Sequence, residues 1–164
     1  MGTPKRLSVT QSEMDLIRRL LECLFPNLDS QHFEPVSEET NDYNCIAWAA
    51  EDTDNWWWPL PEEDGYWPPS IPRTVEKHAF IAAFKAMGYG ECGTNFDLEF
   101  GYEKVALYLD PNDKPTHMAR QLSSGIWTSK LGPIWDIEHS SPSGVEGIPY
   151  GTAAVALRRP IQQS

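Results

Sequence analysis

The chain has 164 residues, of which 24 are acidic and 13 are basic, giving a formal net charge of −11. This balance argues against nucleic acid and anionic membranes as partners, because both require a footprint of Lys and Arg side chains. Hydrophobic residues make up 40% of the chain, and a single domain of this length buries roughly 70% of its unfolded surface, so we expect one domain over residues 1–164 that needs no metal or disulfide.

Residues 1–30 lack the basic start, uninterrupted apolar run and small-residue cleavage site of a signal peptide. No stretch of the chain is long and apolar enough to suggest a membrane span. The three cysteines, Cys23, Cys45 and Cys92, form no C-x-x-C pair, which favours reduced thiols. These features predict a cytoplasmic protein and leave open its delivery into other cells as an effector.

The first predicted element is a helix that begins at Ser12 as its N-cap and ends at Phe25 before Pro26. Its apolar residues recur at helical spacing, which predicts an amphipathic helix lying on the core. Residues 27–42 are rich in acidic residues and are interpreted as an exposed connection. Residues 1–42 therefore form an N-terminal helix and connection ahead of a core over residues 43–157.

A short helix is predicted over Asn44–Glu51, where small and apolar residues follow one another. Residues 51–72 then show no hydrophobic period and carry the clusters Trp56–Pro59 and Tyr66–Pro69. Loops of this length without secondary structure are usually functional. We interpret this loop mainly as structural cover, with its inner tryptophans lining a cleft.

A second amphipathic helix is predicted over Thr74–Met87, with Thr74 as its N-cap and Gly88 after its end. Four strands are then predicted over residues 104–109, 117–122, 126–129 and 152–157, separated by polar turns. Helices followed by antiparallel strands indicate an α+β fold.

Two residues in this arrangement suggest nucleophilic catalysis. Cys45 lies in the first turn of its predicted helix, where the helix dipole lowers the pKa of a thiol. His117 opens a strand after a polar turn and is placed to act as general base and then general acid. The turn at residues 123–125 brings Ser129 and Lys130 back beside His117, where a polar group can orient the imidazole.

Several short motifs appear in a fixed order: N-C-x-A-W-A at 44–49, H-x-x-R-Q at 117–121, S-K-x-G at 129–132, Glu138-His139, and Pro149-Tyr150-Gly151. Over residues 43–157 this succession resembles the NlpC-type branch of papain-like cysteine peptidases and amidases. It also resembles an uncharacterised bacterial family with the same motifs. The resemblance implies a papain-like core in which a cysteine helix precedes the strand that carries the histidine.

The resemblance also implies roles for individual residues. Cys45 would be the nucleophile, His117 the base, and Ser129 the third, orienting residue. The family more often has His, Asn, Asp or Gln at this third position, so Gln121 and Asp136 are alternative candidates. Asn44 is a candidate for the oxyanion hole, although it serves equally well as a helix cap.

Other chemistry is weighed against simpler structural roles. Cys23, on the apolar face of the first helix, and Cys92 are interpreted as small buried core residues and not as nucleophiles. His78 and His139 lack metal-ligand spacing, so we expect neither a metal site nor another cofactor.

Four residues are candidates for substrate binding. Arg120 and Lys130 can hold a carboxylate, and the loop residues Trp57 and Trp67 can stack on a ligand. Each also has an ordinary structural interpretation: the two basic residues as solvated surface charge, and the two indoles as cover over a small core.

The sequence therefore predicts thiol-dependent cleavage of an amide or peptide bond through an acyl-enzyme. Two alternatives remain open. One is a non-catalytic papain-like module that holds a peptide or glycan on the Trp/Pro-rich loop, and the other is a deamidase or transglutaminase-type effector. A protein partner and the oligomeric state are left open.

Overall fold

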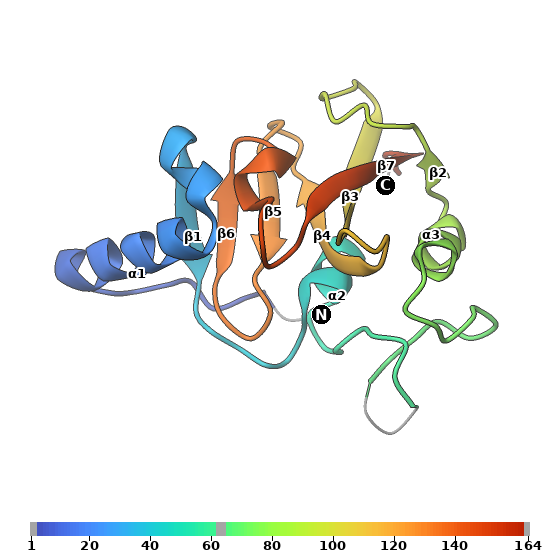
Figure 1. The fold of residues 1–164 in the computed structure, drawn as a ribbon, viewed down its shortest axis with the longest axis horizontal. Helices are drawn as coiled ribbons and strands as arrows, with labels where there is room; N and C mark the ends of the chain where they lie inside the picture. Colours follow the sequence, from blue (N-terminus) through green and yellow to red (C-terminus); the bar gives the residue numbers. More distant parts are fainter. Residues whose placement is uncertain (1–2, 62–64, 163–164) are drawn as a thin grey trace.

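The fold is α+β, built on one seven-stranded antiparallel sheet in the order β1-β6-β5-β4-β3-β7-β2. The computed structural model describes residues 3–61 and 65–162. Figure 1 shows α1 and α3 at opposite ends of the sheet, with α2 between them against its centre. This central helix places residue 45 beside β4.

The helices are α1 (Gln11–Leu24), α2 (Cys45–Ala49) and α3 (Lys77–Lys85), and two short 3₁₀ helices, η1 (Pro26–Ser30) and η2 (Pro142–Val145), accompany them. The strands are β1 (Phe33–Ser37), β2 (Gly90–Glu91), β3 (Tyr102–Leu109), β4 (Pro115–Gln121), β5 (Trp127–Lys130), β6 (Asp136–His139) and β7 (Thr152–Pro160). The four predicted strands correspond to β3, β4, β5 and β7.

The two faces of the sheet pack into separate hydrophobic clusters. Leu107 and Met118, which are register partners, face the cluster that contains α2, α3 and the tryptophan loop. Tyr108 and Ala119 face the other cluster, which contains α1 and η1. Because side chains alternate along a strand, neighbouring residues of β4 contact different halves of the core.

Two predicted helix starts are wrong by a few residues. Thr10, not Ser12, caps α1: its hydroxyl accepts from the Glu13 amide while the Glu13 side chain accepts from the Thr10 amide. This reciprocal capping box satisfies two amides that a helix start leaves free. The third helix begins after Glu76, so Thr74 does not cap it.

Part of the predicted exposed connection is the edge strand β1, which pairs with β6. Its sequence contains Pro35, a residue typical of edge strands and loops, and β6 is only four residues long. Both strands are too short to give a clear alternating pattern. The described residues include no helix with the length and apolar character needed to cross a membrane.

Candidate active site

Cys45 is the first residue of α2 and is buried against β4. Strand β4 has register partners on β5 only at Arg120 and Gln121, so the β4 backbone before Arg120 is free on this side. The backbone amide of Met118 in this stretch, together with those of Cys45 and Ile46, lies close enough to the sulfur to lower the pKa of the thiol. The thiol therefore lies at the gap between β4 and β5, next to the residue that follows His117.

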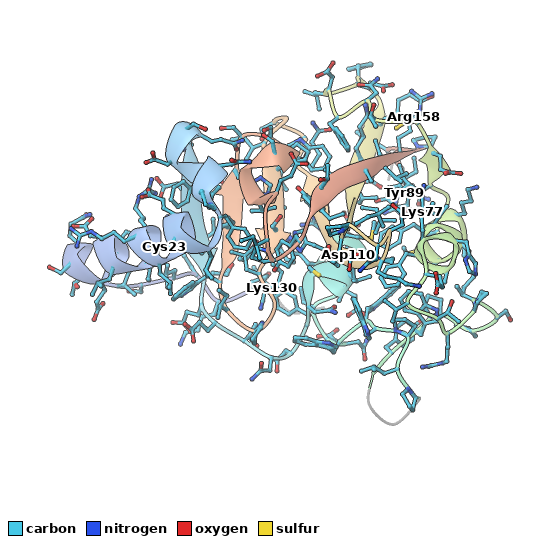
Figure 2. All side chains as sticks on the ribbon, viewed as in Figure 1. Cys23, Lys77, Tyr89, Asp110, Lys130 and Arg158 are labelled. Atoms are coloured by element: carbon cyan, nitrogen blue, oxygen red, sulfur yellow. The ribbon has the colours of Figure 1, made fainter. Side chains whose placement is uncertain are left out.

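Burial nevertheless raises the pKa of the Cys45 thiol to about 11, although the three amides and the nearby Lys130 ammonium each lower it. The expected depression of the pKa by the helix end is thus present but outweighed by desolvation. Lys130 lies near α2, far from Cys23 on α1 (Figure 2). In this state Cys45 is a neutral thiol.

His117 lies on the opposite face of β4 from Met118 and is held by two aromatic rings. The Tyr150 ring stacks on the imidazole at 4.1 Å between centroids and 8° between planes. The Tyr108 ring meets it edge-on at 5.0 Å. These contacts fix the plane of the imidazole.

Gly151 explains how Tyr150 reaches this position. A Cβ atom at residue 151 would lie 2.0 Å from the backbone oxygen of Leu109, and the residue has φ +75°. Only glycine tolerates both this close approach and this backbone conformation. The Tyr150-Gly151 motif therefore lets the chain pass against β3 and lay the Tyr150 ring on His117.

A chain of hydrogen bonds leads away from His117 through the core. Its Nε2 is 3.0 Å from Ser129 Oγ, and the same Oγ is 2.8 Å from Nε2 of His139. Nδ1 of His139 is 2.8 Å from the carbonyl oxygen of Ser141. All three side chains are at least 99% buried, so they bond to one another instead of to water.

The Ser141 carbonyl sets the direction of every bond in this chain. A carbonyl only accepts, so Nδ1 of His139 carries a proton. Burial lowers the pKa of His139 to about 4, so the ring is neutral at pH 7 and its Nε2 accepts from the Ser129 hydroxyl. Ser129 Oγ in turn accepts from Nε2–H of His117.

This assignment leaves Nδ1 of His117 as a neutral nitrogen with a free lone pair. Burial, and then His139, holds the pKa of His117 well below its usual value, so the ring stays neutral near pH 7. Among residues 3–61 and 65–162, Nδ1 has no hydrogen-bond partner. A buried acceptor of this kind is suited to take up a proton.

The sulfur and the imidazole lie on different faces of the sheet, the sulfur within the α2 cluster and the imidazole against Tyr108 of the other cluster. Cys45 contributes to the raised pKa of Tyr150, the residue that stacks on His117. The backbone amide of Met118, the residue that directly follows His117, also lowers the pKa of the Cys45 thiol. No bond joins Cys45 to Nδ1 in this state, so proton transfer requires the thiol to turn toward the ring.

Asn44 acts as a structural cap and as a clamp for the tryptophan loop. Its side-chain oxygen accepts from the amides of Ala47 and Trp57 at 3.1 Å each, and its amino group donates to the Trp57 carbonyl at 2.7 Å. These hydrogen bonds engage both the oxygen and the amino group of the Asn44 side chain. The geometry therefore favours the capping role over a role in the oxyanion hole.

The two alternative orienting residues lie away from His117. Gln121 lies four residues further along β4, about 13 Å away at strand spacing, and its amide faces the carbonyls of Phe96 and Gly125. Asp136 accepts from Thr128 and Ser37 on the α2 face of the sheet. Of the three third-residue candidates, only Ser129 contacts the imidazole.

The expected substrate-binding tryptophans are both buried. The indole of Trp57 donates to Asp52 at 2.7 Å, and that of Trp67 donates to the Pro72 carbonyl at 3.0 Å. Trp67 also packs against Phe80 of α3. These contacts support the structural interpretation of the loop, whose exposed apolar side chains include Leu60 and Tyr66.

The two basic candidates also have partners within the chain. The Arg120 guanidinium lies 4.3 Å from the centre of the Trp48 ring and 3.5 Å from a Glu51 carboxylate oxygen. Lys130 donates to the carbonyls of Thr40 and Gly132. Both are structural cations in this state, and Lys130 lies close enough to Cys45 to influence its pKa.

Sequence reasoning missed the roles of His139 and Tyr150. Both stand in short motifs, Glu138-His139 and Tyr150-Gly151, but nothing in the sequence shows that β6 lies beside β5 or that residue 150 stacks on residue 117. Within the described ranges, no group of three or more His, Cys, Asp or Glu residues is arranged to hold a metal ion.

The sequence matches the model of the family described as "Domain of unknown function (DUF7689)" over residues 34–158. The match includes Cys45, His117, Ser129, His139 and Tyr150, and excludes α1. No curated protein and no solved structure matches the chain. Because the match covers well over half of its 164 residues, the chain belongs to the DUF7689 family.

Proposed function

We propose that the protein is a thiol-dependent hydrolase that cleaves an amide or peptide bond through Cys45 and His117. One observation carries the proposal. The hydrogen-bond chain from Ser141 leaves Nδ1 of His117 as a buried, unpartnered acceptor, in the residue that directly precedes Met118, whose backbone amide lowers the pKa of the Cys45 thiol. The papain-like character suggested by the motif order belongs to the same proposal.

In the proposed reaction, Nδ1 of His117 removes the thiol proton as sulfur attacks the substrate carbonyl carbon. The C–N bond of the tetrahedral intermediate then breaks, and the imidazolium returns its proton to the leaving amine. Water then attacks the acyl-enzyme with the same imidazole as base, the C–S bond breaks to release the acid, and the imidazolium returns its proton to the Cys45 thiolate. The amides around the sulfur favour negative charge during the first step.

Ser129 and His139 hold the base in its reactive form. The hydrogen-bond chain of Ser129, His139 and the Ser141 carbonyl forms a relay. When His117 gains a proton at Nδ1, its Nε2–H still donates to Ser129, so this relay needs no rearrangement. The relay consists of neutral groups, which stabilise an imidazolium less than a carboxylate does. The proposal therefore includes a base that is well oriented but weak, consistent with the lowered pKa of His117.

A second function, binding without turnover, is favoured by the burial of the thiol and its pKa of about 11. Trp57 and Trp67 are buried, so a binding surface on this loop would use Tyr66 and Leu60 instead. Deamidase and transglutaminase activities follow the same first step as hydrolysis and differ only in the substrate or in the acyl acceptor.

The pH dependence of alkylation by iodoacetamide tests the proposed base. The thiolate fraction of an unassisted thiol rises about 100-fold from pH 6 to pH 8, whereas a thiol assisted by neutral His117 reacts at a nearly constant rate over that range. Mass spectrometry separates Cys45 from Cys23, which is exposed and not in the core as predicted, because it lies on the solvent side of α1. We expect a flat profile for Cys45, unlike the steep profile of an unassisted thiol.

The variant His117→Ala should convert the Cys45 profile into a steep one. If Cys45 already follows the steep profile in the wild-type protein, the proposed base does not act on it. Binding without turnover would then be the better account.

A further inference from the structure

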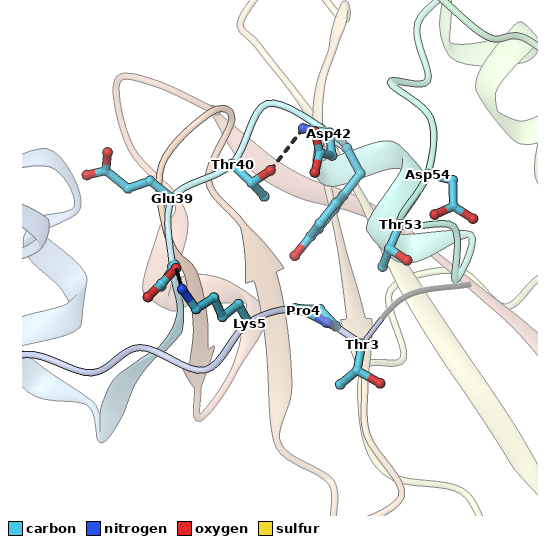
Figure 3. A pocket seen from close by; sticks show the side chains of 10 residues that line it. Thr3, Pro4, Lys5, Glu39, Thr40, Asp42, Thr53 and Asp54 are labelled. Carbon is cyan, nitrogen blue, oxygen red and sulfur yellow. Dashed lines mark hydrogen bonds and ion pairs between the residues drawn. The ribbon is translucent and has the colours of Figure 1, made fainter.

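A pocket of about 720 Å³ lies on the face of the sheet that carries α2, and we call it the Trp48 pocket after the α2 residue that lines it. Thr3 and Pro4 of the N-terminal segment line both this pocket and a smaller one of about 370 Å³ (Figure 3). The N-terminal segment therefore forms one wall of the Trp48 pocket, whose volume suits a small organic ligand.

The floor of the Trp48 pocket is a row of polar side chains that crosses four strands. Arg120 on β4 is the register partner of Thr128 on β5, which pairs with Glu138 on β6, which pairs with Glu34 on β1. All four residues line the pocket. Neighbouring strands lie about 4.8 Å apart, so the Cα atoms of Arg120 and Glu138 are about 10 Å apart. The row thus has a cationic end and an anionic end, with a threonine between them.

The Arg120 guanidinium is held in place but keeps hydrogen-bond donors for a ligand. It lies 4.3 Å from the centre of the Trp48 ring, and its side chain is 17% exposed. Its contact with Glu51 is 3.5 Å long, beyond the ordinary length of a hydrogen bond, and it donates no hydrogen bond within residues 3–61 and 65–162. A guanidinium fixed in this way can bind a carboxylate through two parallel hydrogen bonds.

The Glu138 carboxylate at the other end of the row is half-buried and also has acceptors to spare. In the part of the chain that the structure describes, its side chain has neither a hydrogen bond nor an ion pair. Its register partner Glu34 lies 3.7 Å from Arg18. Like charges directly opposite each other on two strands are unfavourable, so a cationic group at Glu138 would stabilise this end of the pocket.

The charges around the Trp48 pocket compensate one another. The charged residues that line it are two cations, Arg6 and Arg120, and three acids, Glu34, Asp136 and Glu138. Burial raises the pKa of Asp136 to about 7, so this side chain is mostly protonated at pH 6. At that pH two cations and two carboxylates remain, which favours a ligand that carries both charges over a simple anion or cation.

We propose that the Trp48 pocket binds a short peptide as a zwitterion, with the peptide carboxylate on Arg120 and the peptide ammonium on Glu138. An extended dipeptide spans about 7 Å, which fits between two side chains whose Cα atoms are about 10 Å apart. A free amino acid is too short to reach both ends of the row.

The remaining wall of the pocket suits the side chains of such a peptide. Leu7, Met14 and Leu122 line it together with the Trp48 ring and supply apolar contacts. Neither Cys45 nor His117 lines this pocket. The peptide site therefore goes beyond the proposed hydrolysis and does not depend on it.

Calorimetric titration of alanyl-leucine into the Cys45→Ala protein at pH 6 tests the site without turnover. Two blocked peptides are the matched ligands: N-acetyl-alanyl-leucine keeps only the carboxylate, and alanyl-leucine amide keeps only the ammonium. We expect the free dipeptide to bind, and each blocked peptide to bind at least about fivefold more weakly. Failure of the free dipeptide to bind, or equal affinity for all three peptides, would overturn the site.

Two variants assign the charges to the ends of the row. Arg120→Gln should weaken binding of the free dipeptide at least about fivefold and leave the affinity for the amide unchanged. Glu138→Gln should weaken the free dipeptide by a similar factor and leave the affinity for the N-acetyl peptide unchanged. Because Gln has the shape of Glu, the second variant remains informative if Arg120→Gln fails to fold.

Lys77→Gln is the charge-matched control, because it removes an exposed cation from α3 at the other end of the sheet (Figure 1). We expect it to bind alanyl-leucine as the parent protein does. If Lys77→Gln weakened binding as much as Arg120→Gln, the effect would come from net charge alone and the proposed site would be wrong. Unchanged dipeptide binding in both pocket variants would contradict it as well.

Discussion

The two faces of β4 hold the two halves of the candidate active site by different means. On one face, directional hydrogen bonds and stacked rings fix His117, and every link from Ser129 to Ser141 has a defined donor and acceptor. On the other face, apolar packing around α2 buries Cys45, and desolvation dominates the pKa of its thiol.

This difference separates orientation from activation. The Ser141 carbonyl selects the tautomer of His117 through His139 and Ser129, because each hydrogen bond in this chain of neutral groups can have only one donor and one acceptor. Nothing comparable polarises the thiol, whose three amide donors are outweighed by burial. We infer that substrate binding, or rotation of the Cys45 thiol toward Nδ1 of His117, must complete the site.

The largest expected loss of stability comes from breaking the contact that places Tyr150 on His117. Gly151→Ala should destabilise the protein by more than about 4 kcal/mol, because its Cβ would overlap the Leu109 backbone. Urea unfolding measures the change. Gly101→Ala is the control, since φ is +84° there and no atom lies within 4 Å, so only about 1–2 kcal/mol is expected. Equal losses would show that backbone conformation alone matters at residue 151.

Removal of the Ser129 hydroxyl, the central group of the relay, should cause the next largest loss of stability. Ser129→Ala leaves ring nitrogens of His117 and His139 without partners in the core, and we expect a loss of about 2–4 kcal/mol. The exposed Ser123→Ala should change the free energy of unfolding by less than about 0.5 kcal/mol. A Ser129→Ala protein as stable as the wild type would mean that water replaces the hydroxyl.

The face that carries Cys45 should show the opposite kind of pH dependence from the histidine face. Burial raises the pKa of Asp136 to about 7, so the folded state holds a proton that the unfolded state releases, and stability is lost as pH rises through 7. Relative to Asp136→Asn, the wild type should lose about 2–3 kcal/mol of unfolding free energy between pH 5 and pH 8.

Chemical denaturation at these two pH values measures this difference. His117 and His139 have lowered pKa values and act in the opposite direction, destabilising the fold as pH falls below about 6.5. They are present in both proteins and cancel in the comparison. A difference that is constant with pH would contradict a buried, neutral Asp136.

The smallest effect is expected at the edge of the α2 face. Arg120→Gln removes the cation over the Trp48 ring and should cost about 0.5–1 kcal/mol. The ion pair with Glu51 is partly exposed and should add little. Arg19→Gln, at an exposed position of α1, is the control. A loss above about 2 kcal/mol would indicate that Arg120 has a larger structural role than this stacking.

Much of the fold could be predicted because long elements leave clear periodic patterns. The four predicted strands and three helices are present, with ends shifted by a few residues. Strands β1, β2 and β6 have five residues or fewer, too short for a clear alternation, and they were missed because, unlike the equally short β5, none was predicted as the second arm of a hairpin. Capping by Asn44 was recognised because the residue type and its position agree.

The candidate site was predictable only where it depended on local sequence. The hairpin turn at residues 123–125 correctly brings Ser129 to His117. The link to His139 depends on the pairing of β5 with β6, and that of Tyr150 depends on a close approach at Gly151. Both are long-range contacts without a periodic signal. The burial of Trp57 and Trp67 was likewise invisible in a loop without periodicity.

The central claim is that the relay makes Nδ1 of His117 a free acceptor. Two-dimensional ¹H–¹⁵N NMR through long-range imidazole couplings distinguishes protonated from unprotonated ring nitrogens at pH 7. We predict a proton on Nε2 and none on Nδ1 for His117, and the reverse for His139. A proton on Nδ1 of His117, or an imidazolium signal from either ring at this pH, would contradict the account.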